Sequence, residues 1–150
     1  MGTLSDLLML ARQRAATLEL PYQGALTPAE TWQVLQLAPG ARLVDVRSRA
    51  ELDWVGRVPD AVEIEWSSWP GMQRNPNFVS QLRHQVDAEA LVLFICRSGV
   101  RSDGAARAAL EAGYSNCYNV LEGFEGDKDA NGQRNRIGGW RHAGLPWNQG

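Results

Sequence analysis

A short apolar run that leads directly into a cysteine-containing loop constrains this chain more than any other feature. Residues 91–95 are Leu-Val-Leu-Phe-Ile, and residues 96–102 are Cys-Arg-Ser-Gly-Val-Arg-Ser. Residues 103–110 then contain four alanines and are typical of a helix. The pattern predicts a buried strand, a turn and a helix, with Cys96 at the carboxyl end of the strand.

The position of Cys96 favours a reactive thiolate. Backbone N–H groups at a helix N-terminus stabilise negative charge, and Arg97 and Arg101 follow the cysteine closely. Both effects favour the thiolate, which is the nucleophilic form of cysteine. We therefore expect Cys96 to be catalytic rather than a buried structural cysteine. Cys117 has no such cations nearby, so we expect it to pack as a small apolar side chain rather than act as a resolving thiol.

Strands and helices alternate along the chain. This order predicts an α/β fold of three layers, with a mostly parallel central sheet of about five strands and helices on both faces. Ligands bind such folds beyond the carboxyl ends of the strands, where Cys96 falls. The expected strands are 42–46, 62–64, 91–95 and 117–121, and the expected helices are 5–18 capped by Ser5, one from Thr27 to near Pro39, 48–54, 76–85 and 102–112.

Composition excludes several classes of protein. The 150 residues fit one domain with a full core, and a net charge of −2 with no basic run gives no reason to expect nucleic acid or a membrane surface as a partner. The apolar run at residues 7–11 is too short to span a bilayer. Two cysteines are too few for a disulfide scaffold and fit a reducing compartment, so we expect a cytoplasmic protein.

The size of the loop limits its chemistry. If the backbone curls around the sulfur of Cys96, the amides of residues 97–102 form a cradle for an anion. Cysteine phosphatases place one more residue between their cysteine and arginine than the four that separate Cys96 from Arg101, and they typically have His where this chain has Ile95. The shorter loop fits one added sulfur atom better than a tetrahedral phosphate.

The chain resembles the single-domain rhodaneses, which are thiosulfate or persulfide sulfurtransferases. Residues 96–102 match the family's Cys-Arg-x-Gly-x-Arg-Ser in every defined position. Arg57 and Asp60 replace the family's usual His and Gly in a structural turn, where we expect little effect on the chemistry. The other similar segments are Leu-Val-Asp-Val-Arg at 43–47 followed by Glu51 and Trp54, Gly-Arg-Val-Pro-Asp-Ala at 56–61, Leu-Glu-Gly-Phe at 121–124, Gly-Trp at 139–140 and Gly-Leu-Pro at 144–146.

The resemblance implies a rhodanese-like domain at residues 25–150, with a helical extension at 1–24 and a polar loop insertion at 125–139. It also implies that Cys96 takes a sulfur from thiosulfate or a persulfide, holds it as a persulfide and passes it to cyanide or a thiol. The expected partners are a small-molecule donor and a thiol acceptor, with a protein persulfide as a further option. No cofactor is expected.

The same resemblance makes the whole loop, Arg97, Ser98, Gly99, Val100, Arg101 and Ser102, the expected substrate-binding site. The two arginines either bind the anionic donor or brace the loop; we favour Arg101 near the entrance, with Arg97 assisting. The hydroxyls of Ser98 and Ser102 are candidate donors to the persulfide, although Ser102 is equally a candidate helix N-cap.

Several residues outside the loop are expected to have structural roles. Asp45, Arg47 and Glu51 would support the site, with Arg47 and Glu51 forming an ion pair at four-residue spacing. Trp32 and Trp54 are expected in the core, and one ring of Trp66 or Trp69 is expected to wall the pocket.

No metal site is expected. Residues 127–132 imitate the first half of a calcium loop, but Gly138 stands where the closing Glu would be. His84 and His142 are far apart in the sequence and lack a second ligand motif.

Two other functions compete with sulfur transfer. One is a small cysteine phosphatase, and the other is a non-catalytic rhodanese-like module that presents a binding surface. Such modules usually lose the cysteine, whereas this chain keeps it. The identity of the donor and acceptor and the oligomeric state stay open.

Overall fold

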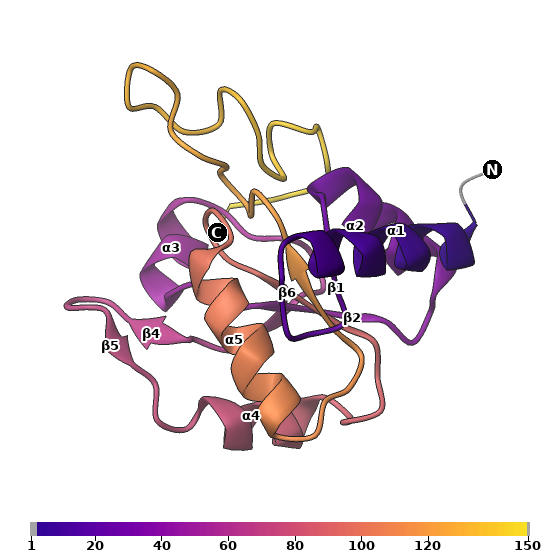
Figure 1. Cartoon of the computed structure of the whole chain (residues 1–150). Helices are drawn as coiled ribbons and strands as arrows, with labels where there is room; N and C mark the ends of the chain where they lie inside the picture. Colours follow the sequence, from indigo (N-terminus) through magenta and orange to yellow (C-terminus); the bar gives the residue numbers. More distant parts are fainter. Residues whose placement is uncertain (1–2, 150) are drawn as a thin grey trace.

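Five parallel strands form the central sheet, in the order β1-β7-β6-β2-β3 (Figure 1). The computed structural model describes residues 3–149. A parallel sheet of five strands with helices on both faces confirms the expected fold class. The strands of the sheet are β1 (Gly24–Leu26), β2 (Arg42–Asp45), β3 (Val62–Glu63), β6 (Val92–Ile95) and β7 (Cys117–Val120).

Helices cover both faces of the sheet, and a separate two-stranded hairpin projects from one side (Figure 1). The helix after the cysteine loop begins two residues earlier than expected, and Thr3 rather than Ser5 caps the first helix. The helices are α1 (Leu4–Thr17), α2 (Pro28–Leu37), α3 (Arg49–Trp54), α4 (Phe78–Gln85) and α5 (Val100–Glu111), and the antiparallel hairpin is β4 (Ser67–Ser68) with β5 (Gln73–Arg74).

The core lies in two layers because successive side chains of a strand point to opposite faces. Val44 and Phe94 pack in the layer that α4 and α5 cover. Leu43 and Leu93 pack in the other layer, with the buried sides of α1 and α2 and the ring of Trp140. The continuous apolar pattern of these strands follows from burial on both faces.

The edge strand β1 is absent from the strands expected from the sequence. It has only three residues and begins with Gly24, which in isolation is typical of a chain break. A Cβ atom at Gly24 would lie 2.8 Å from the Cβ of Ala11 and 2.8 Å from the ring of Tyr118. Glycine is therefore needed where α1 crosses close to the sheet, and pairing with β7 completes the strand.

The carboxyl ends of β2, β6 and β7 meet at one edge of the sheet. Asp45 is paired with Ile95, and Phe94 is paired with Asn119. In Figure 1 the segment of residues 121–149 lies at the end of the molecule where α5 begins. This edge is where the loop with Cys96 emerges. Within residues 3–149, the helices are too short or too polar to cross a lipid bilayer.

A buried ion pair fixes the turn after β2. The side chains of Asp45 and Arg47 are fully buried, with a separation of 2.7 Å between Arg47 Nη2 and Asp45 Oδ2. Arg47 also donates to the carbonyl of Gly56, and its guanidinium lies 4.1 Å from the centre of the Phe124 ring. Arg47 therefore pairs with Asp45, and the expected pair with Glu51 is wrong. The reason is the tight turn after β2, which places the carboxylate of Asp45, the last residue of the strand, beside the guanidinium of Arg47.

Replacing Asp45 with Ala should destabilise the fold strongly, because it leaves the Arg47 charge buried without its partner. The expected loss in free energy of unfolding is about 3 to 5 kcal/mol. Asp53→Ala is the control, since Asp53 pairs with Arg57 at a partly exposed position and should cost at most about 1 kcal/mol. Urea unfolding measures both, and equal losses for the two variants would contradict the importance of the buried pair.

Candidate active site

Two hydrogen-bond donors point at the sulfur of Cys96. The residue exposes only 1% of its surface at the end of β6. The backbone N–H of Gly99 lies 3.1 Å from Sγ, and the hydroxyl of Ser102 lies 3.3 Å from it. Donors placed in this way stabilise negative charge on the sulfur or on a group attached to it. Ser102 is therefore the residue whose hydroxyl contacts the sulfur. It does not cap α5, because the N-cap of that helix is Gly99.

The backbone of Gly99 turns the loop toward the sulfur. Its φ of +109° lies in a region that side chains with a Cβ rarely adopt. Its carbonyl accepts hydrogen bonds from the backbone N–H of Asp103 and from the side-chain amide of Asn119, at 3.2 Å each. These two bonds fix the peptide that follows Gly99, while the N–H of Gly99 itself points at Sγ of Cys96.

Backbone amides of residues 124 and 125 hold the outer side of the loop. The N–H of Phe124 donates to the carbonyl of Cys96 at 2.8 Å, and the N–H of Glu125 donates to that of Arg97 at 2.9 Å. A Cβ atom at Gly123 would lie 2.5 Å from the carbonyl oxygen of Cys96. Because Gly123 has no side chain, the segment that follows β7 can approach the segment that follows β6 closely enough to form these hydrogen bonds.

A bidentate ion pair joins the loop to α3. The Nη1 and Nη2 atoms of Arg101 lie 2.7 and 2.8 Å from the two carboxylate oxygens of Glu51. Ser48, the N-cap of α3, also donates to Glu51 from its hydroxyl and its backbone N–H. Burial alone would raise the pKa of Glu51, but the hydrogen bonds and charge of Arg101, together with Ser48, lower it to about 2. Glu51 is therefore a carboxylate across the physiological pH range.

The two arginines of the loop have different surroundings. Burial of Arg101 favours its neutral form, but Glu51 and the nearby Cys96 sulfur raise the pKa of the guanidinium overall. The side chain of Arg97 is exposed, and within residues 3–149 it makes no ion pair or side-chain hydrogen bond. Arg101 is thus held in place, while Arg97 keeps its charge available.

Neither Val100 nor Ser98 makes a hydrogen bond to the sulfur among the described residues. Val100 is 78% exposed on the first turn of α5. Ser98 is half-buried, and its hydroxyl makes no hydrogen bond within the part of the chain that the structure describes. Ser102 is therefore the loop serine whose hydroxyl reaches Sγ.

Asn119 and Tyr22 support the loop from behind, and neither was expected from the sequence. Asn119 lies on β7 and holds Gly99. The hydroxyl of Tyr22 donates to the Asp103 carboxylate at 2.6 Å, in the first turn of α5. The available signal for Asn119 is a polar residue inside an otherwise apolar strand, because a buried amide needs a specific partner.

A cavity of about 430 Å³ lies beside the loop. Trp69 forms part of its wall, as expected, whereas Trp66 packs on the ring of Phe78. Trp54 is 71% exposed at the cavity, so its expected place in the core is wrong; Trp32 is half-buried. The lining residues are Ser48, Ala50, Glu51, Trp54, Val55, Trp69, Met72, Arg97, Arg101 and Glu125.

Cys117 is unlike Cys96. Burial raises the pKa of its thiol to about 12, and the thiol lies 3.0 Å from the carbonyl of Tyr114. It packs in the core as a neutral thiol. Among residues 3–149, no three His, Cys, Asp or Glu side chains gather closely enough to hold a metal ion.

A family model described as the rhodanese-like domain matches residues 27–130. This chain belongs to the rhodanese-like domain family. A crystal structure of a protein from M. tuberculosis is 47% identical to this rhodanese-like chain, with a TM-score of 0.79, and the match covers 86% of this chain and 99% of that one. An uncharacterized protein of Rickettsia conorii is 37% identical over 110 residues, which is 71% of this chain and 82% of that protein.

A relative with a named activity is more distant. The thiosulfate sulfurtransferase GlpE of Actinobacillus succinogenes is 27% identical over 121 residues, which cover 81% of this chain and 86% of that protein. Sulfurtransferases are therefore among the relatives of this rhodanese-like domain.

Replacing Glu51 with Gln should weaken the attachment of the loop to α3. We expect a loss of about 1 kcal/mol in free energy of unfolding near pH 7, since solvent partly screens the pair. The pKa of Glu51 falls from 4.5 to about 2 on folding. The stabilisation is therefore complete above pH 4.5 and disappears as the pH falls toward 2.

Urea unfolding of the wild type and of Glu51→Gln at several pH values between about 7 and 3 measures this difference. Glu111→Gln, at an exposed position in the last turn of α5, is the control and should change little. A difference between wild type and Glu51→Gln that stays constant on acidification would show that the ion pair does not carry the effect.

Proposed function

We propose that this rhodanese-like domain is a sulfurtransferase that carries a sulfur atom as a persulfide on Cys96. The observation that carries the proposal is the pair of donors, the N–H of Gly99 and the hydroxyl of Ser102, aimed at Sγ. A persulfide anion is small enough for this cradle and would receive the same hydrogen bonds. Both cysteines are free and buried, which fits a reducing compartment, and we place the reaction in the cytoplasm.

The first step transfers a sulfur to the enzyme. The Cys96 thiolate attacks the outer sulfur of thiosulfate, the sulfur–sulfur bond of the donor breaks, and sulfite leaves with the electron pair. The product is the Cys96 persulfide anion. A persulfide donor reacts in the same way, with a thiolate as the leaving group. Cradle donors that are already in place favour both the attacking thiolate and the persulfide formed.

The second step returns the enzyme to its starting state. An acceptor nucleophile, such as a thiolate or cyanide, attacks the outer sulfur of the persulfide. The bond between that sulfur and Sγ breaks, and Cys96 leaves as a thiolate. Splitting the transfer into two steps removes the need for donor and acceptor to meet.

Separate roles follow for the two arginines. We assign Arg101 to bracing the loop, because Glu51 engages both of its terminal nitrogens. We assign Arg97 to binding the anionic donor, because its guanidinium is exposed and lines the cavity. This assignment reverses the order expected from the sequence, in which Arg101 took the donor and Arg97 assisted.

Thiosulfate should add one sulfur atom to Cys96, a mass increase of about 32 daltons. Intact-mass spectrometry of the protein incubated with thiosulfate measures the adduct, and cyanide should then remove it as thiocyanate. Cys117→Ser should keep the adduct and Cys96→Ser should lose it. An absence of the adduct from the wild type, or hydrolysis of a phosphate ester in its place, would rule out the proposed function.

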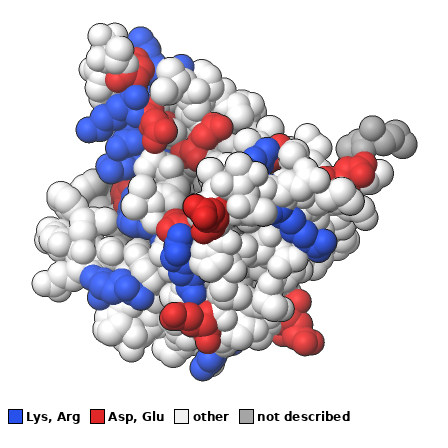
Figure 2. All heavy atoms as spheres, viewed as in Figure 1, with Lys and Arg blue, Asp and Glu red and all other residues white. Residues whose placement is uncertain are grey.

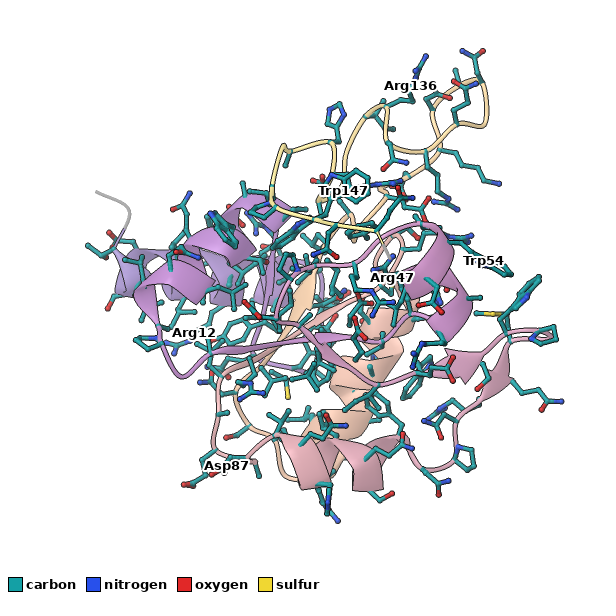
Figure 3. All side chains as sticks on the ribbon, turned by 180° about the vertical axis from the view of Figure 1, so that it is seen from behind. Arg12, Arg47, Trp54, Asp87, Arg136 and Trp147 are labelled. Atoms are coloured by element: carbon teal, nitrogen blue, oxygen red, sulfur yellow. The ribbon has the colours of Figure 1, made fainter. Side chains whose placement is uncertain are left out.

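Arg97→Ala should raise KM for thiosulfate about tenfold or more while changing kcat less, because a charged hydrogen bond to the donor is lost. Arg101→Ala should instead lower the thermal stability and reduce kcat. Arg12→Ala is the control, since Figure 3 places Arg12 on the opposite side of the molecule from Trp54. An unchanged KM in Arg97→Ala would contradict the assignment to this arginine.

A further inference from the structure

Three large apolar side chains are exposed together beside the cysteine loop. Trp54, Trp69 and Met72 expose 71%, 58% and 42% of their surfaces, and all three line the cavity that Arg97 also lines. We call these three side chains the entrance rim. A gathering of exposed aromatic and thioether groups at one cavity is typical of a binding site for an apolar group.

The entrance rim is built from two elements that are each held in place. Trp54 is the last residue of α3 and lies at its outer edge in Figure 3. Trp69 and Met72 lie in the turn between β4 and β5. Arg74 stacks 3.5 Å from the centre of the Trp66 ring, and that ring packs at 5.0 Å on Phe78 in the core. The hairpin is thereby anchored to the body of the protein.

The backbone of the hairpin turn holds Met72 in an uncommon conformation at the cavity. Its φ of +47° lies in the left-handed region, which is uncommon for a long side chain and carries a cost. The turn therefore maintains an unfavourable backbone conformation with Met72 at the edge of the cavity. A flexible thioether suits contact with varied apolar groups.

The charged groups that line the cavity differ in how they are paired. Among the described residues Arg97 makes no ion pair, whereas Arg101 is bound to Glu51, and the other carboxylate of the cavity, Glu125, lies 3.8 Å from Arg141. Figure 2 shows a largely uncharged surface at the tip of the hairpin, at the left edge of the view. The entrance therefore combines one available cation with an apolar wall.

We propose that the entrance rim makes this site selective for organic sulfur donors that join an apolar body to an anionic sulfur end. The inference rests on the proposed sulfur transfer through Cys96. Thiosulfate has no apolar surface and gains nothing from the rim. The cavity of about 430 Å³ falls in the size range of sites for small organic ligands. In an organic thiosulfonate, the charged end would face Arg97 and the carbon body would contact Trp54 and Trp69.

The chemical step is the same for such a donor. The Cys96 thiolate attacks the outer sulfur of benzenethiosulfonate, the sulfur–sulfur bond breaks, and benzenesulfinate leaves with the electron pair. Methanethiosulfonate undergoes the same reaction and leaves methanesulfinate. Both donors produce the same persulfide, so a difference between them reports on contacts with the organic body.

The test compares the second-order rate of persulfide formation with the two donors, by mass spectrometry in single turnover. After correction for their reactivity toward a free thiol, we expect the wild type to prefer the benzene compound about tenfold or more, from two aromatic contacts. In Trp54→Ala/Trp69→Ala this preference should fall to about twofold or less. Met9→Ala, an exposed methionine on α1, is the control and should keep it.

Binding of the leaving groups separates this inference from the proposed function. Benzenesulfinate should bind the wild type about tenfold more tightly than methanesulfinate, and the double tryptophan variant should lose that difference. If no donor loads Cys96, sulfur transfer is wrong, whether or not the sulfinates bind. If both donors load Cys96 with a corrected preference that the double variant retains, sulfur transfer stands and the role of the entrance rim is overturned.

Discussion

The bidentate ion pair between Arg101 and Glu51 is the contact on which the geometry of the cysteine loop depends. Four residues between Cys96 and Arg101 are too few to form a structure of their own. The loop is held instead by groups from the ends of other elements. Glu51 fixes it to α3, and the amides of residues 124 and 125 hold its outer carbonyls. Asn119 and the backbone N–H of Asp103 hold Gly99, whose own N–H points at the sulfur together with the hydroxyl of Ser102.

Three arginines lie in the two family-like segments at residues 43–47 and 96–102. They differ in how deeply they are buried, and each has a different role. Arg47 is fully buried and paired with Asp45, so it contributes to the turn after β2. Arg101 is partly buried and paired with Glu51, so its charge is near the sulfur but its position is fixed. Arg97 is exposed and without an ion pair among the described residues. A charge serves ligand binding best where no internal partner already neutralises it, which favours Arg97 as the anion contact.

Strands and helix starts could be predicted from the sequence, because they depend on residues that are close together along the chain. The sequence pattern located four of the five sheet strands, and the helix expected from Thr27 is present, with Thr27 as its N-cap and a capping box to Glu30. Contacts between distant segments could not be predicted in the same way. Four-residue spacing favoured an Arg47–Glu51 pair, but the turn after β2 gives Arg47 to Asp45, and Glu51 finds a partner fifty residues away.

The exposed Trp54 shows the same limit. Trp54 was expected in the core, but α3 has only six residues and ends at Trp54, and the ring is 71% exposed. Asn119 was missed because its partner, Gly99, lies on a neighbouring segment twenty residues earlier. Residues that position the loop are thus spread over several elements, and their roles appear only once the sheet brings those elements together.

The most direct measurement is a crystal structure of the protein after treatment with thiosulfate. We expect a second sulfur atom bonded to Sγ of Cys96, lying inside the loop and accepting hydrogen bonds from its backbone amides, with Arg101 still bound to Glu51. A second sulfur that lies outside the loop, or a loop that separates from Glu51 to admit it, would contradict the central role of the preformed cradle.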